Sequence, residues 1–450
     1  MECVLALHDL AGHLIRVTLL SPQQDFIHRQ FSVGEAFGRS TAQAYPLTGF
    51  LQGPHGGELI LDSLAAVDAG ARHVTTGQGR RLAYDALVVA VGARPCAWLE
   101  GALTFTGPDD VGALSALLAE LVAGEAGSVA FALPTERMWP LPLYELAVMT
   151  AEHLREHASA AEVWLITPEE RPLALFGPAA AGAIAPLLAD RGVRVRTSAR
   201  AKAVRPHALA LAGSGDVWVD RVVTLPVLEG PAIPGLPADE HGFHCVDAFG
   251  RVPGRQGVYA AGDATTFPLK QGGLAAQQAD AVAESIAASL GAAVLPQPFR
   301  PVLRGMLMTS GAPLYLRAEP QRLARDSTVA IEARPQQRLQ RYPSTATGQP
   351  LWWPPAKVAG RYLAPFLATA RPSTLPTEQL TDRVAVAGAP GIDDDYNDAL
   401  ELALLLADGD ARWGDYGAAL AALDAAQALH GALPPEYERK RDRWMAAGRP

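Results

Sequence analysis

Apolar and polar positions alternate at two different periods along the middle of the chain. Three segments place apolar residues three and four positions apart, the spacing of an amphipathic helix, and short apolar runs between them are typical of buried strands. We expect helices at 109–123, 142–156 and 177–192, and strands at 128–133, 162–167 and 193–197. Because strands that alternate with helices form crossover units on a parallel sheet, residues 106–235 are predicted to form one α/β domain.

Sheet signals also occur on either side of this domain. A helix is expected at 3–11, a strand at 14–20 and a sheet segment at 81–91, which ends in the turn Val91-Gly92-Ala93-Arg94-Pro95. Much later, a strand at 257–261 runs into Gly262-Asp263, and a helix is expected at 272–290. The strand, loop and helix pattern therefore returns after the central domain.

The last third of the chain differs in character. Residues 296–380 contain many prolines, few clear periods and the pair Trp352-Trp353, which indicates a small mixed domain. Helices are expected at 394–407, 413–430 and 434–447, within an all-helical tail spanning 381–450. The stretch from Gly414 to Tyr416 and the apolar positions after it resemble a tetratricopeptide-repeat hairpin. Because one or two hairpins are too few for a solenoid, we favour a helical lid packed on the body.

The composition excludes several classes of function. With 450 residues, 49% apolar and 19% charged, the chain can bury a core, and its length predicts two or three domains. The net charge of -9 gives no basic field for a phosphate backbone, so nucleic acid is not an expected partner. No apolar run approaches the roughly 20 residues of a membrane-spanning helix. Glu2 and Asp9 interrupt the first apolar stretch, unlike a secretory signal, so a cytoplasmic location is expected.

Cysteine and histidine give no sign of a metal site. Cys3, Cys96 and Cys245 lie far apart and form no paired motif, so each is expected to be a small buried apolar side chain. His153 and His157 are four residues apart but lack a third ligand, and no metal is predicted.

The first candidate for chemistry is the pair Gly262-Asp263. It follows a predicted strand, and the carboxyl ends of parallel strands are where α/β sheets bind nucleotides. The Asp263 carboxylate would accept hydrogen bonds from ligand hydroxyls, with the Gly262 backbone held close. The alternative is an ordinary turn, in which Gly-Asp is also common.

The second candidate is the loop Lys270-Gln271-Gly272-Gly273, which leads directly into a predicted helix. Free backbone N–H groups and the positive end of the helix dipole would face this loop and stabilise negative charge. A reduced flavin carries such charge on its pyrimidine side. The alternative is a glycine-rich helix start without a ligand.

Three stretches, in this order and at this spacing, resemble one flavoprotein family. They are YDALVVAVGARP at 84–95, GVYAAGD at 257–263 and KQGGLAAQQ at 270–278. Together they are similar to the FAD/NAD(P)-dependent pyridine nucleotide-disulfide oxidoreductases, which have two dinucleotide-binding domains and include type II NADH dehydrogenases and sulfide:quinone oxidoreductases. The resemblance covers about residues 1–300 and extends to the small domain after them.

This resemblance implies an α/β protein with two interleaved Rossmann-like domains. The FAD-binding domain would consist of residues 1–105 and 236–295, with the second domain at 106–235 between them, followed by the small domain at 296–380 and the tail. Asp263 would contact the ribityl and pyrophosphate region of FAD. The implied cofactor-binding residues are Gly92, Ala93, Arg94, Gly262, Asp263, Lys270, Gln271, Gly272 and Gly273.

The chain departs from the family at its first residues. The family begins with a strand and a GxGxxG turn, whose glycines admit the pyrophosphate to a helix N-terminus. Both are missing here, because Met1 falls where the helix after that turn should be under way, and Ser21-Pro22 replaces the usual acidic ribose ligand. Either the true start lies upstream or the flavin site has been lost. We favour the upstream start, because Asp263 and the loop after it look intact.

The second departure concerns the nicotinamide nucleotide. The turn after the strand at 128–133 should be glycine-rich, but it contains Pro134, Trp139, Pro140 and Pro142. Proline offers no N–H to a phosphate and Trp139 would crowd it, so NAD(P) binding is not expected. Sulfide:quinone oxidoreductases similarly replace this turn, but their paired redox cysteines are not matched, so sulfide chemistry is not expected either.

Two aromatic segments have alternative interpretations. Trp139, Tyr144 and Glu145 are interpreted as core aromatics with a carboxylate at a helix start, in preference to a redox role. Residues 351–366 mix aromatic and basic side chains, which would suit peripheral contact with a membrane. An internal domain interface or a subunit interface is the favoured alternative.

The sequence therefore predicts an FAD-dependent oxidoreductase that passes electrons from an unknown donor to a quinone or another small acceptor. The alternative is a flavin-free relative that acts as an interaction module, binding a protein partner through residues 394–447. The donor, the acceptor, the catalytic residues and the oligomeric state are not specified by any motif.

Overall fold

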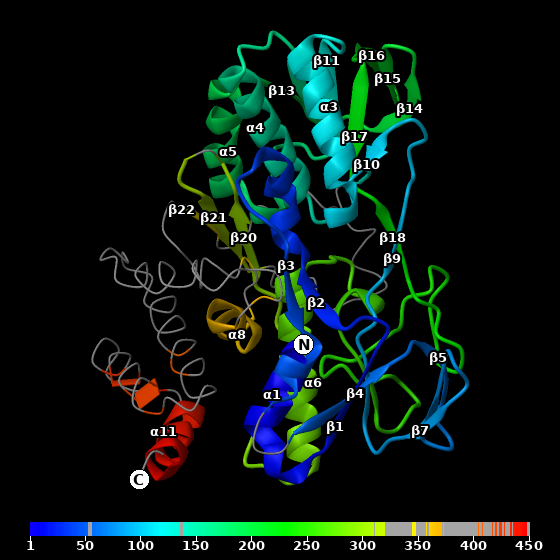
Figure 1. Cartoon of the computed structure of the whole chain (residues 1–450), viewed down its shortest axis with the longest axis vertical. Helices are drawn as coiled ribbons and strands as arrows, with labels where there is room; N and C mark the ends of the chain where they lie inside the picture. The colour runs from blue at the N-terminus through cyan, green and yellow to red at the C-terminus, as the bar shows by residue number, and fades with distance from the viewer. Residues whose placement is uncertain are drawn as a thin grey trace.

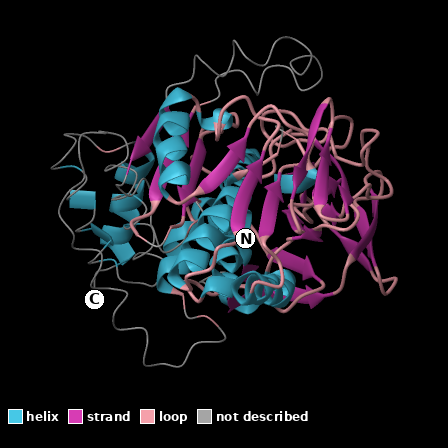
Figure 2. Ribbon diagram, turned by 90° about the horizontal axis from the view of Figure 1, so that it is seen from above, coloured by secondary structure: helices cyan, strands magenta, loops and turns pink. Residues whose placement is uncertain are grey.

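The fold is described from a computed structural model (Figure 1). It describes residues 1–52, 56–135, 138–309, 311–319, 344–347, 357, 360–370 and 372, single positions between 404 and 433, and residues 435–447. Seen from above, the helices gather toward one side of the molecule and the strands extend toward the other (Figure 2).

A five-stranded parallel sheet forms the centre of the second α/β region. The strand order is β10 (Leu103–Thr104), β17 (Arg221–Thr224), β11 (Ser128–Ala132), β12 (Glu162–Ile166) and β13 (Val193–Arg196). The helices between strands are α3 (Val111–Ala123), α4 (Leu141–Glu156) and α5 (Pro178–Asp190). The alternation predicted from periodicity is confirmed, and the largest apolar core joins this sheet to its helices.

Two shorter parallel pairs lie at the other end of the molecule. β1 (Val17–Ser21) pairs with β4 (Gly57–Leu61), and β8 (Leu87–Val89) pairs with β19 (Val258–Ala260). The helix α1 (Glu2–Ala11) packs along α6 (Gly272–Ser289), and side chains from both strand pairs enter the same core. Segments separated by the whole second α/β region therefore interleave in space.

Antiparallel pairs and three-stranded sheets account for most of the other strands. Their members are β2 (Asp25–His28) with β3 (Gln43–Pro46); β5 (Leu64–Asp68), β6 (His73–Thr76) and β7 (Arg81–Ala83); β9 (Arg94–Cys96) with β18 (Val227–Glu229); and β14 (Ala201–Arg205), β15 (Ala208–Leu211) and β16 (Ser214–Trp218). Short helical turns occur at η1 (Gly12–Leu14), η2 (Arg29–Phe37), α2 (Leu47–Phe50), η3 (Pro108–Asp110), η4 (Ala174–Phe176) and η5 (Gly262–Ala264).

The single sheet segment predicted at 81–91 is wrong in one respect, because it splits into β7 and β8. The backbone N–H of Tyr84 donates to Arg72 at 3.0 Å and closes the hairpin, whereas that of Leu87 donates to Gly257 at 2.8 Å. The chain thus changes partners between these two residues. A continuous apolar run does not reveal such a change, since pairing is non-local.

The C-terminal third contains a small antiparallel sheet and short helices. The sheet consists of β20 (Leu303–Leu307), β21 (Leu314–Ala318) and β22 (Ser344–Thr347), and α8 (Leu363–Thr369) follows it. The predicted last helix is observed as α11 (Pro435–Ala447), whereas those at 394–407 and 413–430 fall mostly outside the described residues. Within the part of the chain that is described, no helix is long and apolar enough to cross a membrane.

Cysteine burial differs from expectation at two positions, because only Cys3 is buried. Cys3 is buried, and burial raises the pKa of its thiol to about 12, while Cys96 is half-buried. Cys245 is exposed, contrary to the prediction, because it lies in an irregular loop between His244 and the turn that begins at Asp247.

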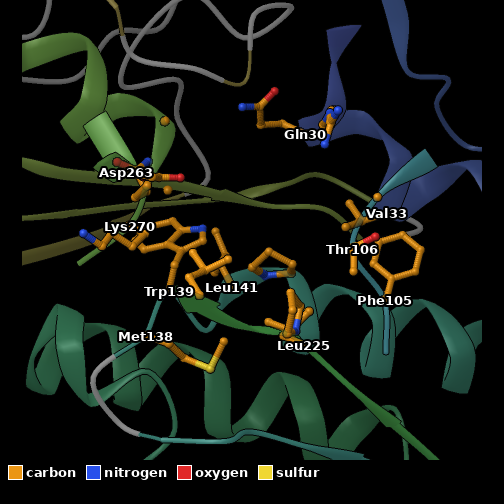
Figure 3. A pocket seen from close by; sticks show the side chains of 18 of the residues that line it. Gln30, Val33, Phe105, Thr106, Met138, Trp139, Leu141, Leu225, Asp263 and Lys270 are labelled. Carbon is orange, nitrogen blue, oxygen red and sulfur yellow. The ribbon is translucent and has the colours of Figure 1, made fainter. Parts of the chain in front are cut away.

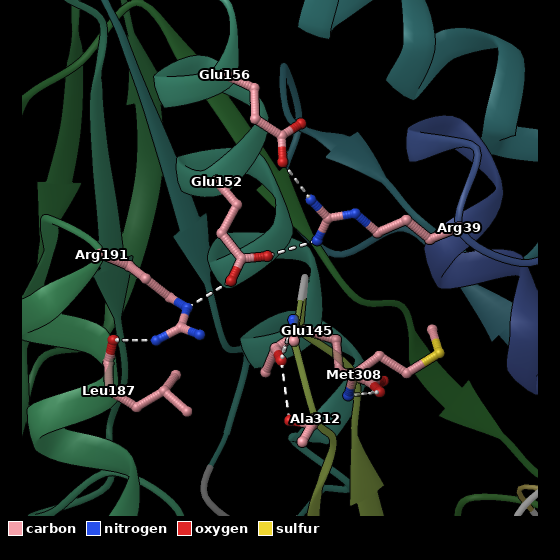
Figure 4. A network of polar contacts seen from close by, with 10 residues as sticks. Arg39, Glu145, Glu152, Glu156, Leu187, Arg191, Met308 and Ala312 are labelled. Atoms are coloured by element: carbon pink, nitrogen blue, oxygen red, sulfur yellow. Dashed lines mark hydrogen bonds and ion pairs between the residues drawn. The ribbon is translucent and has the colours of Figure 1, made fainter.

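A buried carboxylate on α4 ties three segments together (Figure 4). Glu152 is fully buried, and its two oxygens accept from Arg39 and Arg191 at 2.5 Å each. Arg39 also contacts the half-exposed Glu156 at 3.1 Å. Since a buried charge is tolerated only when paired, this arrangement holds the loop after η2 and the end of α5 against α4.

Glu152→Gln is expected to lower the free energy of unfolding by about 3 kcal/mol, because Arg191 loses its buried counter-charge and Arg39 keeps only the half-exposed Glu156. Urea denaturation measures the change. Glu156→Gln is the matched control on the same helix: its carboxylate is 54% exposed, so a loss of less than about 1 kcal/mol is expected. Equal losses in the two variants would contradict the structural role assigned to Glu152.

Candidate functional site

One cavity of about 500 Å³ lies where the two α/β regions meet the C-terminal strands (Figure 3). Segments from η2, the turn after β11, the start of α4, the end of β17, the loop before α6 and β20 contribute to its wall. Figure 3 shows Asp263, Lys270 and Trp139 toward one side, with Val33, Phe105 and Thr106 toward the other. The lining combines apolar side chains with a few charged groups, as ligand sites do.

Five of the nine residues proposed from sequence line this cavity: Asp263, Lys270, Gln271, Gly272 and Gly273. Gly262 lies directly behind them, and its backbone N–H donates to the side chain of Gln278 at 2.6 Å. Its φ of +74° is a conformation that glycine adopts without strain. The strand β19 thus delivers the following Asp263 to the cavity wall.

The other three residues are not brought into the cavity wall. Gly92 and Ala93 follow β8, and Arg94 begins β9. The Arg94 guanidinium is 73% exposed and forms an ion pair with Glu229 of β18. The interaction with Glu229 raises the pKa of Arg94. This side chain therefore has a partner on the surface.

The N-terminus of α6 opens toward the cavity. The Gln271 side chain caps the helix by accepting the N–H of Leu274 at 2.8 Å, and it donates to the carbonyl of Arg304 at 3.1 Å. The N–H groups of Gly272 and Gly273 belong to the first turn, where helical partners are lacking. The positive end of the dipole of this 18-residue helix consequently faces the cavity.

Asp263 and Lys270 carry opposite charges at this end of the cavity and influence each other electrostatically. Burial raises the pKa of the Asp263 carboxyl, although Lys270 opposes the shift. Burial lowers the pKa of Lys270 to about 8, against the opposing effect of Asp263. The Lys270 ammonium donates to the Thr265 carbonyl and lies 3.9 Å from the centre of the Phe243 ring. Asp263 forms no hydrogen bond with the described residues, so its oxygens can accept from a ligand.

A second charged pair, which the sequence did not predict as functional, lies in the same cavity. The Lys357 ammonium contacts the Glu145 carboxylate at 2.8 and 3.0 Å, and the side chains are 7% and 1% exposed. Glu145 also accepts the N–H of Met308 at 2.9 Å, and Lys357 donates to the carbonyl of Gln30 at 3.0 Å. Burial raises the pKa of Glu145 and lowers that of Lys357, so desolvation favours the neutral form of each.

The interpretation of Glu145 as an ordinary carboxylate at a helix start is therefore incomplete. Its partner lies 212 residues away, and no local pattern connects the two. The one available signal was the scarcity of lysine, which occurs only at positions 202, 270, 357 and 440. Two of these four lysines line the cavity.

The turn after β11 is filled by an indole ring. Trp139 lines the cavity, and its ring packs edge-on against Phe176 with centroids 5.5 Å apart. On β20, a Cβ at Gly305 would lie 2.9 Å from Leu141 and 3.0 Å from Phe176, so a larger residue there would require these side chains to move. The sequence interpretation of Trp139 as a core aromatic is thus half right, because the ring packs on the core and also faces the cavity.

Tyr144 and Glu169 form a closed polar cluster beside this turn. Glu169, just after β12, accepts from the Tyr144 hydroxyl at 2.5 Å, the Thr167 hydroxyl at 2.9 Å and the N–H of Ala174 at 3.1 Å. Burial raises the pKa of Glu169 to about 7, with these donors opposing the shift. In dinucleotide-binding α/β domains an acidic residue near this strand end binds the ribose hydroxyls. Here the carboxyl is already occupied by the protein's own donors.

The aromatic and basic segment at 351–366 is internal where it is described. Tyr362 and Phe366 are buried and pack beside α1, and Lys357 enters the cavity. This placement agrees with the interface interpretation. Trp352 and Trp353 lie outside the described residues.

Comparison with known proteins agrees with the resemblance seen in the sequence. Residues 144–283 match the family described as pyridine nucleotide-disulphide oxidoreductase, and this match includes Asp263 and the loop at 270–273. No curated protein sequence matches the chain. The suspected resemblance to this family is thereby confirmed for the matched region.

Solved structures show the same fold. The chain is similar to the sulfide:quinone oxidoreductase of Aquifex aeolicus, with a TM-score of 0.63 and 19% identity over 77% of this chain and 84% of that one. A ferredoxin reductase of Rhodopseudomonas palustris gives 0.54 and 18% over 71% and 79%. NDH2 of Plasmodium falciparum, in complex with NADH, gives 0.50 and 15% over 59% and 63%. At these identities the likeness confirms the α/β, Rossmann-like fold.

Lys357→Met is expected to make stability depend on pH. Without the ammonium, the pKa of buried Glu145 rises further above its ordinary value of 4.5, so the folded state favours the protonated carboxyl. Relative to the parent protein, the free energy of unfolding should therefore fall as pH rises from about 5 to 8, by about 3 kcal/mol at the upper end. Chemical denaturation across this pH range measures it.

The double variant Glu145→Gln/Lys357→Met is the control for this prediction. It carries no buried charge at the pair, so it should recover part of the lost stability at pH 8 and show no additional pH dependence. A loss in Lys357→Met that is the same at every pH would show that the two side chains are not electrostatically coupled.

Proposed function

We propose that this protein is an FAD-dependent oxidoreductase whose flavin lies in the cavity beside Asp263 and the start of α6. It would pass electrons from a donor other than NAD(P)H to a quinone or another small acceptor. The observation that carries this proposal is the convergence of Asp263 and the 270–273 loop on one cavity, beside a buried pair of proton-bearing groups.

The residues present fit a flavin on two counts. Asp263 is a largely buried carboxylate with acceptor capacity unused by the described residues, which suits the hydroxyls of a ribityl chain or a ribose. The first turn of α6 directs N–H groups and a positive dipole at the cavity, which suits the pyrimidine side of the ring. When bound, the flavin would supply two-electron and one-electron transfer.

The chain's own residues would bind, orient and exchange protons. Lys270 adds positive charge next to Asp263, and its lowered pKa of about 8 allows it to release a proton near neutral pH. At the other pair, a proton can be held on Nζ of Lys357 or on a carboxylate oxygen of Glu145, since burial favours the neutral form of both. Both pairs would buffer the charge changes that accompany electron transfer in an enclosed site.

The acceptor is inferred from the apolar part of the wall. Phe105, Met138, Trp139, Leu141 and Leu225 face the same space as the charged pairs, so a flat apolar molecule with polar oxygens would match it. A quinone has this chemistry. The sulfide:quinone oxidoreductase among the similar structures supports this proposal through its fold alone.

The donor is inferred from the turn after β11 and the cluster around Glu169. Trp139 occupies the position where a phosphate-binding glycine turn would be needed, and Tyr144 satisfies the carboxyl expected to bind ribose. A nicotinamide dinucleotide would have to displace both. We therefore propose a donor that needs neither group.

The purified protein is expected to bind FAD, seen as a visible flavin absorption band that survives gel filtration after incubation with FAD. Asp263→Ala should weaken FAD binding roughly tenfold or more, because hydrogen bonds to a charged acceptor are lost. Asp263→Asn keeps one acceptor oxygen and should lose less. If the protein takes up no FAD, either as this chain or with the residues encoded upstream of Met1 added, the redox proposal is wrong and the interaction module is the better hypothesis. Unchanged affinity in Asp263→Ala would refute the role of this carboxylate.

NADH and NADPH are expected not to reduce the bound flavin. Anaerobic stopped-flow spectroscopy should show no bleaching of the flavin band with either nucleotide at about 1 mM, near the upper end of typical Michaelis constants. Dithionite should bleach the band, and a soluble quinone should restore it. Reduction by NADH within seconds would overturn the inference drawn from Trp139 and Glu169.

A further inference from the structure

A lysine near the C-terminus is enclosed by aromatic rings. Lys440 of α11 is only 1% exposed. Its ammonium lies 4.4 Å from the ring centre of Tyr437, 5.3 Å from that of Tyr362 and 6.0 Å from that of Trp444. It also lies 3.3 Å from a carboxylate oxygen of Asp9. A desolvated cation in such a setting is held firmly, because aromatic faces and a carboxylate together replace its water.

The enclosure joins three elements that are far apart in the sequence. Tyr437 and Trp444 belong to α11 itself, Tyr362 stands just before α8, and Asp9 belongs to α1. A second cation strengthens the junction: the Arg361 guanidinium lies 5.4 Å from the ring centre of Tyr437. Arg361 also pairs with Glu284 of α6 at 3.7 Å. The C-terminal helix is therefore fastened to the body through residues 361 and 362.

The same short segment is fastened a second time, to α1. The Glu2 carboxylate accepts the N–H groups of Tyr362 at 2.7 Å and Leu363 at 2.6 Å. At Gly360 a Cβ would lie 2.7 Å from Glu2, so the backbone approaches this carboxylate as closely as glycine allows. Phe366 stacks on Phe50 with ring centres 4.1 Å apart.

This segment also carries a side chain of the cavity. Lys357 precedes Tyr362 by five residues, and its ammonium reaches Glu145. The φ of Lys357 is +50°, in the left-handed region that residues other than glycine rarely adopt. Such a conformation persists only where the surroundings impose it. Besides the contacts of Lys357 itself with Glu145 and Gln30, the nearest described constraints along the chain are the anchors at residues 360–366.

We propose that Lys440 is a positioning residue for the cavity: by burying its ammonium against Tyr362 and Asp9, the C-terminal helix fixes the segment that presents Lys357 to Glu145. The catalytic use of Lys357 rests on the proposed function, but the positioning itself does not. The tail thus acts as an internal clamp, with the face of α11 that bears Tyr437, Lys440 and Trp444 turned to the body.

The scarcity of lysine allows a direct test without flavin. The chain has four lysines: Lys202 is exposed, Lys270 and Lys357 line the cavity, and Lys440 is enclosed. A short pulse of acetic anhydride at pH 8, followed by peptide mass spectrometry, gives the relative labelling rate of each amine. In Lys440→Met, labelling of Lys357 relative to Lys202 is expected to rise about tenfold, as local opening becomes easier. Lys270 should keep its rate, because it is held by a different loop.

Two variants separate positioning from general loosening. Lys440→Arg keeps a cation in the enclosure and should restore most of the protection of Lys357. Arg439→Met removes one positive charge from the adjacent, exposed position on α11 and should leave Lys357 protected. Unchanged labelling of Lys357 in Lys440→Met would overturn the proposal, as would equal loosening in Arg439→Met.

A global loss of fold would appear as faster labelling of Lys270 together with Lys357. In that case the variant Asp9→Asn is measured in the same way, because it removes only the ion pair and leaves the aromatic rings in place. Faster labelling of Lys357 without faster labelling of Lys270 supports the clamp. Unchanged labelling of Lys357 refutes it. Because no step needs bound FAD, failure of this test and failure of the proposed redox function are distinguishable.

Discussion

The buried ion pair between Glu145 and Lys357 is the interaction on which the geometry of the cavity depends. Each charge is out of water, so each requires the other, and the requirement joins α4 of the second α/β region to the C-terminal segment. The backbone N–H of Met308, just after β20, donates to Glu145, and the carbonyl of Gln30 in η2 accepts from Lys357. Four segments distant in the sequence therefore meet at one point, and the cavity is the space they enclose.

The two ends of the cavity differ in electrostatic character. At one end Asp263 and Lys270 face the N-terminus of α6, whose dipole favours negative charge on a ligand. At the other end the Glu145–Lys357 pair is formally neutral and deeply buried, so its main variable is the location of a proton. Burial raises the pKa of the two carboxyls, Glu145 and Asp263, and lowers the pKa of the two lysines, Lys270 and Lys357. In all four groups it therefore favours the neutral form. This arrangement suits chemistry in which electrons and protons move together.

The second α/β region has a Rossmann-like architecture, and protein side chains fill the turn after β11 and satisfy the carboxyl just after β12. Its parallel sheet has the expected order of strands and helices, but Trp139 occupies the turn and Tyr144 saturates Glu169. Both replacements are internally satisfied, by packing on Gly305 and by a hydrogen-bond cluster respectively. The fold alone therefore does not determine what this region binds. Binding depends on a few side chains, and the same sheet can carry different side chains at those positions.

The sequence by itself determined many of the local elements and the end of the cavity formed by Asp263 and residues 270–273. Apolar periodicity located α3 to α6 and the strands β11, β12, β13 and β19, since side-chain spacing follows directly from helix and strand geometry. The Gly262-Asp263 turn and the loop at 270–273 were found because a strand end and a helix start are encoded within a few residues. Tertiary structure decided the rest. It split the apolar run at 81–91 between two sheets, exposed Cys245, left Arg94 on the surface and paired Glu145 with a lysine 212 residues away. These outcomes depend on contacts between segments that are distant in the sequence and share no local pattern. A buried charge pairs with whichever opposite charge the fold places beside it, so its partner cannot be identified from neighbouring residues.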